Sequence, residues 1–357
     1  MPESSGQFRM ALCLLLALFG LMLLAPAAMS QATAMGKTFE EIVKSAAKEG
    51  KARIGAGMSS DDAAVILKGF NQKYPMIKVE VTRTSGIDPA ERLLNEALAG
   101  LVEYDLYDIP AALQNRFVKS GVLAGPIDWQ KLFPNVPKIH FSPDGHFNAV
   151  AFNLRIIAYN ASLVSPERVP KNWSDCLDPY WKGRMAVDTN PRSLSGLYKS
   201  WGEARILEYA ARLKNNQPIW KNGQSEALAQ LAAGEFSILC GAHYASIHRL
   251  LRRDHKAKVT MSIPGEVPVS LSQMMAVMKG AQNPNAALLF SAWSNSVDGQ
   301  KFYDQIGRGS PFVQGSEQWK LIENSGGKTV FEGWDRTEYE PMISKKIAAI
   351  WGFPVGN

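Results

Sequence analysis

The chain has 357 residues, of which 46% are hydrophobic and 20% are charged, so it has the composition of a globular protein and not of a disordered or fibrous one. This length predicts two domains, whose cores can be large enough to fold without a metal or a disulfide. The formal net charge of +6 favours anionic partners only mildly and is too small for a typical nucleic-acid-binding protein.

The first 34 residues have the pattern of a secretory signal peptide. An apolar run of fourteen residues from Ala11 to Leu24 is followed by small residues. Such a run spans about 21 Å as a helix, short of the roughly 30 Å hydrocarbon core of a bilayer, so a permanent membrane helix is the weaker interpretation. We therefore expect a cleaved segment 1–34, a mature chain that starts between Gln31 and Met35, and a periplasmic location.

Strand patterns alternate with helix patterns in the first half of the chain, which predicts a parallel sheet with helices on its faces. A capping box at Thr38 and Glu41 starts the first helix, and Gly50 ends it. The expected strands are 51–57, 77–83 and 104–109, then two consecutive strands at 147–152 and 156–160, and the intervening helices begin near positions 60, 88 and 111.

The second half of the chain predicts another α/β unit. Its expected strands are 184–188, 236–239 and 258–263, and its expected helices are 204–213 and 226–233. Ser225 is the expected cap of the second helix. Asn283 and Pro284 predict a cap and a first-turn proline for a later helix, and apolar residues from Tyr339 to Ile350 mark one face of the last helix.

Three stretches in the second half form a recognisable set. Residues 170–184 read PKNWSDCLDPYWKGR, residues 231–235 read LAAGE, and residues 283–300 read NPNAALLFSAWSNSVDGQ. In their order and spacing they resemble the PxxWxDLxDPxWKGK, LxxGE and HPNAAxLFxxWLLSPEGQ segments of periplasmic solute-binding proteins of ABC importers, in the branch that includes ferric-iron binders. With the export signal, the resemblance covers nearly all of the mature chain.

The resemblance implies a type II periplasmic binding protein, with two α/β lobes joined by crossover strands and a ligand cleft sealed by hinge closure. Mapped onto this chain, lobe one comprises 35–153 and 262–357 and lobe two comprises 154–261, with C-terminal helices able to pack across both. The resemblance also implies a monomer without a cofactor or catalysis, which delivers its solute to an inner-membrane permease driven by an ATPase.

Loops at the carboxyl ends of strands are the expected ligand site, because helix N-termini there favour anions. The lobe-one candidates are Ser59, Ser60, Thr84, Ser85 and Gly86, with Ala111 or Gln114 after the third strand. The lobe-two candidates are Thr189, Asn190, Arg192, Ser193, Ser195, His243 and Tyr244. Any single Ser or Thr can instead be a plain helix cap, and Arg192 can either contact a carboxylate or phosphate or lie in a solvated loop.

The ferric binders that the chain resembles use two adjacent tyrosines after the LxxGE strand. The matching positions here are Tyr244 and Ala245, so the second tyrosine is lost. Fe(III) prefers several anionic oxygen donors, and Tyr244 with Asp61 or Asp62 is a poor set unless an anion or chelator completes it. A small anion, free or complexed to a metal, is therefore the leading solute, and direct Fe(III) binding through Tyr244 is the alternative.

Other interpretations remain beside these. Cys240 and His243 can be the nucleophile and base of a two-lobed periplasmic enzyme, although no residue that would orient His243 is visible. Cys176 and Cys240 can form one disulfide in an oxidising compartment, but nothing local brings them together. A polyamine solute is disfavoured because the candidate loops are poor in carboxylates and aromatic side chains.

Overall fold

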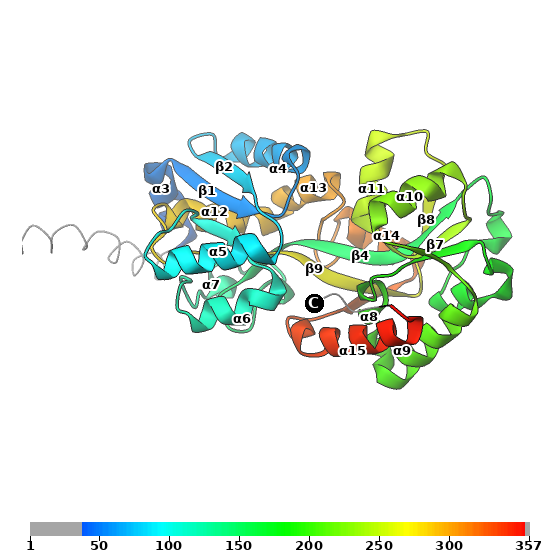
Figure 1. The fold of residues 1–357 in the computed structure, drawn as a ribbon. Coiled ribbons are helices and arrows are strands. Elements are labelled where there is room, and N and C mark those ends of the chain that lie inside the picture. The colour runs from blue at the N-terminus through cyan, green and yellow to red at the C-terminus, as the bar shows by residue number, and fades with distance from the viewer. Residues whose placement is uncertain (1–37, 354–357) are drawn as a thin grey trace, which may run out of the picture.

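The protein consists of two α/β lobes joined by two long strands (Figure 1). A computed structural model describes residues 38–353, so the expected signal peptide lies outside the described residues. The strands β4 (Asn148–Asn160) and β9 (Glu266–Val277) run from one lobe to the other. The predicted two-lobed α/β class is therefore confirmed. Within this part of the chain, no helix combines the length and the apolar composition that crossing a bilayer requires.

Lobe one is built on a mixed sheet in the order β2-β1-β3-β9-β4. β1 (Lys51–Ala56) pairs in parallel with β2 (Lys78–Arg83) and β3 (Leu106–Asp108), and β9 runs antiparallel to β3. The helices of this lobe are α3 (Phe39–Glu49), α4 (Ser60–Lys73), α5 (Ile87–Leu98), α6 (Ala111–Lys119), α7 (Trp129–Leu132), α12 (Pro284–Asn295) and α13 (Val297–Gln305). The predicted capping box at Thr38 and Glu41 is present on α3.

Lobe two carries the second half of β4 in a sheet with the order β4-β7-β5-β6, and β8 also pairs with β4. Its strands are β5 (Met185–Asp188), β6 (Ile219–Lys221), β7 (Ile238–His243) and β8 (Val259–Ser262). Its helices are α8 (Arg192–Ser195), α9 (Tyr198–Asn215), α10 (Gln224–Ala233) and α11 (Tyr244–Arg253). Four short 3-10 helices complete the connections: η1 (Lys138–His140), η2 (Pro166–Arg168), η3 (Trp173–Leu177) and η4 (Pro179–Trp181).

The C-terminal elements follow α13, and the last two of them contact α9 of lobe two. They are α14 (Glu317–Ser325), β10 (Lys328–Phe331) and α15 (Arg336–Trp351). α15 lies along α9, and its Ile343, Ile347 and Trp351 belong to the lobe-two core. The lobe boundaries at 153/154 and 261/262 stay predictions. Although the last elements were assigned to lobe one by these boundaries, they contact lobe two.

Three local predictions are wrong. Residues 147–152 and 156–160 form one strand, β4, because its two halves pair with β9 and β7 without an intervening turn. β7 continues past the expected end at residue 239 to His243. α10 begins at Gln224 after Gly223, so Ser225 lies in the first turn and is not the cap.

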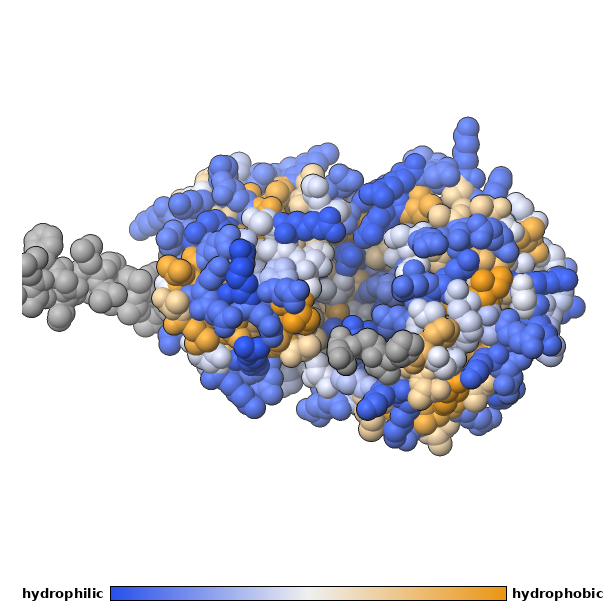
Figure 2. All heavy atoms as spheres, viewed as in Figure 1, coloured by the Kyte–Doolittle hydropathy of each residue, from blue (hydrophilic) through white to orange (hydrophobic). Residues whose placement is uncertain are grey.

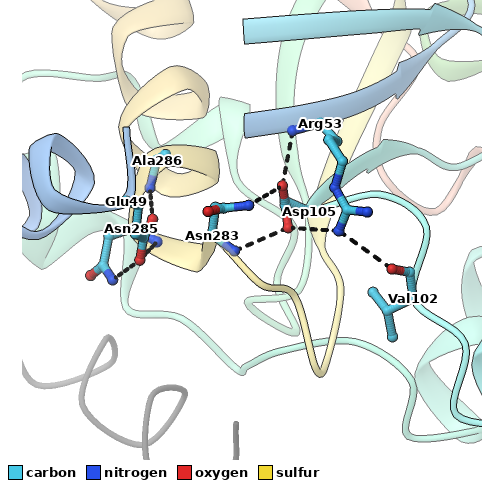
Figure 3. A network of polar contacts seen from close by, with 7 residues as sticks. All are labelled: Glu49, Arg53, Val102, Asp105, Asn283, Asn285 and Ala286. Carbon is cyan, nitrogen blue, oxygen red and sulfur yellow. Dashed lines mark hydrogen bonds and ion pairs between the residues drawn. The ribbon is translucent and has the colours of Figure 1, made fainter. Parts of the chain in front are cut away.

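Two carboxylates of lobe one hold the start of α12 in place (Figure 3). Asp105 accepts hydrogen bonds from the backbone N–H and the side-chain amide of Asn283, both at 3.0 Å. Glu49 accepts from the backbone N–H groups of Asn285 at 3.2 Å and Ala286 at 2.7 Å, so it caps the helix. Asn283 occupies the expected cap position, but its side chain bonds Asp105 and not the helix. Residues 283–286 of the 283–300 motif therefore position α12 in lobe one, which is a structural role.

Cys176 in η3 and Cys240 in β7 form a disulfide in the core of lobe two. The bond links residues 64 positions apart, which lowers the entropy of the unfolded chain and stabilises the lobe by about 2–4 kcal/mol. The sequence left open whether Cys176 and Cys240 form a disulfide, and the structure contains this bond. Since the thiolate is the nucleophilic form of cysteine, the disulfide removes Cys240 as the nucleophile of the enzyme interpretation.

Ion pairs join the two lobes between α4 and α11. Asp62 Oδ1 lies 2.8 Å from Nη2 of Arg252, and Asp62 Oδ2 lies 3.8 Å from Nη2 of Arg249. The Asp62 side chain is only 3% exposed, whereas the adjacent Asp61, which pairs with Arg253 at 3.7 Å, is 72% exposed. Because screening weakens exposed pairs, Asp62 is the stronger contact between the lobes.

We predict that Asp62→Asn destabilises the protein by about 1–3 kcal/mol, because two half-buried arginines lose their counter-charge. Asp61→Asn is the matched control and should change the free energy of unfolding by less than about 1 kcal/mol. Urea unfolding of both variants at low and high salt measures the difference. Equal stability of the two variants would contradict the prediction.

His140 is a neutral histidine in the interior of lobe one. Its Nδ1 lies 2.9 Å from Oδ1 of Asn295 and its Nε2 lies 2.8 Å from Oγ of Ser310. Burial lowers the pKa of this imidazole to about 4. The ring also packs on Phe152 of β4, with 4.7 Å between centroids. His140 therefore packs against β4 inside lobe one and has a structural role.

The lowered pKa of His140 gives a pH dependence of defined sign. The folded state binds this proton more weakly than the unfolded state, so the stabilising contribution is complete above pH 6.5 and is lost as the pH falls towards 4. We expect a loss of about 3 kcal/mol from this residue over that window. His140→Gln should show a shallower pH dependence in urea unfolding than wild type, and the exposed control His255→Gln should not.

Candidate functional site

A cleft of about 850 Å³ lies between the two lobes, where Figure 2 shows the surface hollowed. Its walls come from loops of both lobes, and its floor comes from the crossing strands β4 and β9. The volume falls within the range of small-molecule sites. The cleft is therefore the candidate binding site.

The lobe-one wall presents two helix N-termini to the cleft. Thr84, Ser85 and Gly86 line it after β2, and Ala111 lines it after β3. Neither helix has a side-chain cap, because the N-cap of α5 is Gly86 and that of α6 is Pro110. Uncapped N–H groups and the helix dipole favour a negative charge here.

Asp108 at the end of β3 holds the lobe-one edge of the cleft together. Its Oδ2 accepts a hydrogen bond from the N–H of Gly57 at 3.3 Å, and its Oδ1 accepts one from the N–H of Met274 at 3.0 Å. Burial raises the pKa of this carboxyl, while the two backbone donors act in the opposite direction. Both oxygens of Asp108 are thus occupied by the backbone.

A relay of hydrogen bonds orders the lobe-two wall. Asp188 accepts from the N–H of Asn190 and from Nε2 of Gln224, each at 2.9 Å. Oε1 of Gln224 in turn accepts from the N–H of His243 at 3.0 Å. The loop after β5 and the end of β7 are therefore fixed to one another through Asp188.

His243 faces the cleft as an uncharged group. Burial lowers its pKa well below 6.5, and the positive charges of Arg155 and Arg308 lower it further. At neutral pH this imidazole can exchange hydrogen bonds with a solute, but it supplies no charge.

The remaining cleft carboxylates lie beside arginines. Arg192 Nε is 2.6 Å from Oε1 of Glu340 on α15. Arg336 Nη1 is 3.8 Å from Oε2 of Glu332 and donates to the carbonyl of Leu271 at 3.2 Å. Both acidic groups therefore have a cation close by.

Arg155 differs from these arginines. It lies on β4 opposite His243 of β7, is 8% exposed, and lines the floor of the cleft. Its Nε and Nη1 have no hydrogen-bond partner among the described residues, and no carboxylate there forms an ion pair with it. The polar residues Asn153, Ser270 and Ser272 line the floor with it.

The predicted ligand residues divide into two groups. Those that line the cleft are Thr84, Ser85, Gly86, Asn190, Arg192, Ser193 and His243, and those absent from its lining are Ser59, Ser60, Thr189, Ser195 and Tyr244. Ser59 caps α4 by accepting from the N–H of Asp62 at 3.2 Å. Ser195 and Tyr244 are buried. Solute contact by the predicted residues stays a prediction.

Tyr244 lies at the start of α11 and is 7% exposed. Burial raises the pKa of its phenol to about 12, with further contributions from Asp304 and Glu317, so the phenolate that binds Fe(III) is disfavoured. The position of the lost tyrosine, Ala245, donates its N–H to Oδ1 of Asn153 at 3.4 Å. Within residues 38–353, no three His, Cys, Asp or Glu side chains are grouped to hold a metal ion.

Several cleft residues were missed because they come from strands, from α15 and from the segment between β10 and α15, and not from the loops that were searched. They are Asp108, Asn153, Arg155, Asp188, Ser270, Ser272, Glu332, Arg336 and Glu340. One signal was available: Asn153 and Arg155 alternate inside the otherwise apolar stretch 149–158, which marks a polar face at that point of the strand. Nothing comparable in the sequence marks Glu332 or Arg336.

Two curated relatives match part of the chain. A putrescine/cadaverine-binding protein of Pseudomonas aeruginosa is 27% identical over 188 residues, which cover 45% of this chain and 51% of that protein. An Fe(3+)-binding periplasmic protein of Serratia marcescens is 25% identical over 172 residues, covering 47% and 50%. The chain thus spans about half the length of the curated relatives it matches.

A solved structure shares the whole fold. The FutA (IdiA) protein of Trichodesmium, in complex with iron and citrate, superposes with a TM-score of 0.67 at 19% identity, covering 84% of this chain and 99% of that one. The family model of the bacterial extracellular solute-binding proteins matches residues 107–335, which include both crossing strands and most of the cleft. The chain belongs to the family of bacterial extracellular solute-binding proteins.

Proposed function

We propose that the protein is the solute-binding component of an ABC importer and captures a small anionic solute, free or complexed to a metal, in the cleft between its lobes. One observation carries the anionic class. The cleft has unoccupied donors, at Arg155 and at the N-termini of α5 and α6, while its carboxylates already lie against protein donors or arginines. A solute that brings negative oxygens satisfies these donors.

A diamine is the competing solute, since the Pseudomonas relative is named for putrescine and cadaverine. The cleft has more carboxylates than the candidate loops contain, namely Asp108, Asp188, Glu332 and Glu340. An ammonium group needs carboxylate oxygens that are free to accept. Asp108 and Asp188 accept two protein hydrogen bonds each. Glu340 pairs with Arg192 and Glu332 lies beside Arg336, and although Oε1 of each glutamate lacks a hydrogen-bond partner, a positive charge already lies next to both. This arrangement supports an anion over a diamine.

The transport role extends the family membership. We further propose a periplasmic monomer that closes by rotation about β4 and β9 and then delivers its solute to an inner-membrane permease and its ATPase. Two lobes with a cleft between them, two strands that cross between the lobes, and a secretory pattern in residues 1–34 support this. No catalytic step is proposed.

A thermal-shift screen tests the solute class. We expect stabilisation by at least one organic carboxylate, phosphonate, sulfonate or ferric chelate, and none by putrescine or neutral sugars. A ligand present at 100 times its dissociation constant adds about 2.7 kcal/mol of stability. Stabilisation by diamines or sugars alone would reject the anionic class.

Direct iron binding makes a separate prediction. Tyr244 is buried and absent from the cleft lining, and burial raises the pKa of its phenol. It should therefore not bind Fe(III) as a phenolate, and protein mixed with ferric salt alone should remain colourless. Tyr244→Phe should change the affinity for an anionic solute by no more than about 0.5 kcal/mol, as for a residue without ligand contact. Visible absorption and titration calorimetry measure both. A stoichiometric coloured complex that the Phe variant lacks would favour the iron alternative.

A further inference from the structure

Arg155 is a buried cation without a partner. The residue is 8% exposed, its Nε and Nη1 have no hydrogen-bond partner, and among residues 38–353 no carboxylate pairs with its guanidinium. A guanidinium has five N–H donors and does not lose its charge in a protein, so it cannot escape this situation by deprotonation. Leaving such donors unpaired destabilises the folded state.

The charged groups around Arg155 do not form an ion pair with its guanidinium. Glu332 and Glu340 attract it, Asp188 attracts it more weakly, and Arg336 repels it. None of these acids forms an ion pair with Arg155: Glu332 lies beside Arg336 with its Oε1 lacking a hydrogen-bond partner, Glu340 pairs with Arg192, and Asp188 accepts two hydrogen bonds. His243, which faces Arg155 across the β4–β7 pairing, is neutral. The Nε and Nη1 donors of Arg155 are therefore available to a solute that brings negative oxygens.

We propose that Arg155 is the anchor for the oxyanion group of the solute, a carboxylate, phosphonate or phosphate. The proposal rests on the proposed anionic solute and adds the residue and the chemical group that it binds. A planar guanidinium with free edges matches two oxygens of such a group and forms charge-assisted hydrogen bonds with them. The uncapped N-termini of α5 and α6 line the same cleft and favour the same charge.

The rest of the cleft indicates an organic anion. Leu271 and Met274 of β9 line it together with Tyr107 of β3. A volume of about 850 Å³ is much larger than an inorganic oxyanion requires. The geometry therefore assigns the charged end of the solute to Arg155 and its apolar body to this surface.

Three variants separate binding from structure. Arg155→Met removes the charge with similar apolar length, Arg155→Lys keeps the charge without the planar fork, and Arg116→Met removes a remote surface charge that is 52% exposed. The probes are phenylphosphonate and benzoate, with benzyl alcohol as the uncharged counterpart. Thermal unfolding with and without each probe, and calorimetric titration with each anion, are the measurements.

We expect ligand-free Arg155→Met to unfold at or above the wild-type midpoint, because an unpaired buried charge is removed. The same variant should lose about 30-fold or more in affinity for the anion that binds wild type, Arg155→Lys should lose less, and Arg116→Met should match wild type. Benzyl alcohol should not distinguish the proteins.

Two results would overturn the proposal and leave the proposed function intact: unchanged anion affinity in Arg155→Met, or a clearly lowered midpoint of ligand-free Arg155→Met with normal folding of Arg116→Met. If neither anion stabilises any of these proteins, the anionic class fails and the role of Arg155 fails with it.

Discussion

The antiparallel pairing of β4 with β9 is the constraint on which the rest of the molecule depends. These strands run from Asn148↔Met275 to Leu154↔Val269 and carry the chain between the lobes, so they fix where the two sheets lie. The same residues must complete both apolar cores and also form the floor of a polar cleft. Alternation along a strand reconciles these demands, because successive side chains point to opposite faces. Asn153 and Arg155 occupy the cleft face while Phe152, Leu154 and Ile156 belong to the core.

Different residues of the cleft hold its walls in place and remain available to a solute. Asp108 ties the loop after β1 to β9, and Asp188 ties the loop after β5 to the end of β7 through Gln224. Asp108 and Asp188 therefore shape the walls, and each of their oxygens accepts a hydrogen bond from the protein. These two residues therefore offer few free acceptors to a cationic solute, which supports the proposed anionic class.

Much of the fold could be predicted because its signals are local. The helix cap at Thr38 and the β–loop–helix alternation depend on neighbouring residues, and the scaffold motif at 283–286 depends on a short segment. β9 was not predicted, since Pro268 and several polar residues break up its pattern, and its place is determined by pairing with β3 and β4. Most of the cleft lining was not predicted for the same reason: Arg336 and Glu340 reach the cleft only because α15 packs on α9.

The network around Glu49 and Asp105 also determines the order in which the chain can fold. Glu49 bonds Asn285 across 236 positions and Asp105 bonds Asn283 across 178, so lobe one lacks the start of α12 until most of the chain has been synthesised. The strands β5 to β8 and the helices α8 to α11 of lobe two, by contrast, come from one continuous segment, although α15 later adds Ile343, Ile347 and Trp351 to its core. Contacts between distant residues form slowly because loop closure must precede them. The sheet of lobe two can therefore form first, lobe one then closes around its two ends, and α15 completes the lobe-two core last.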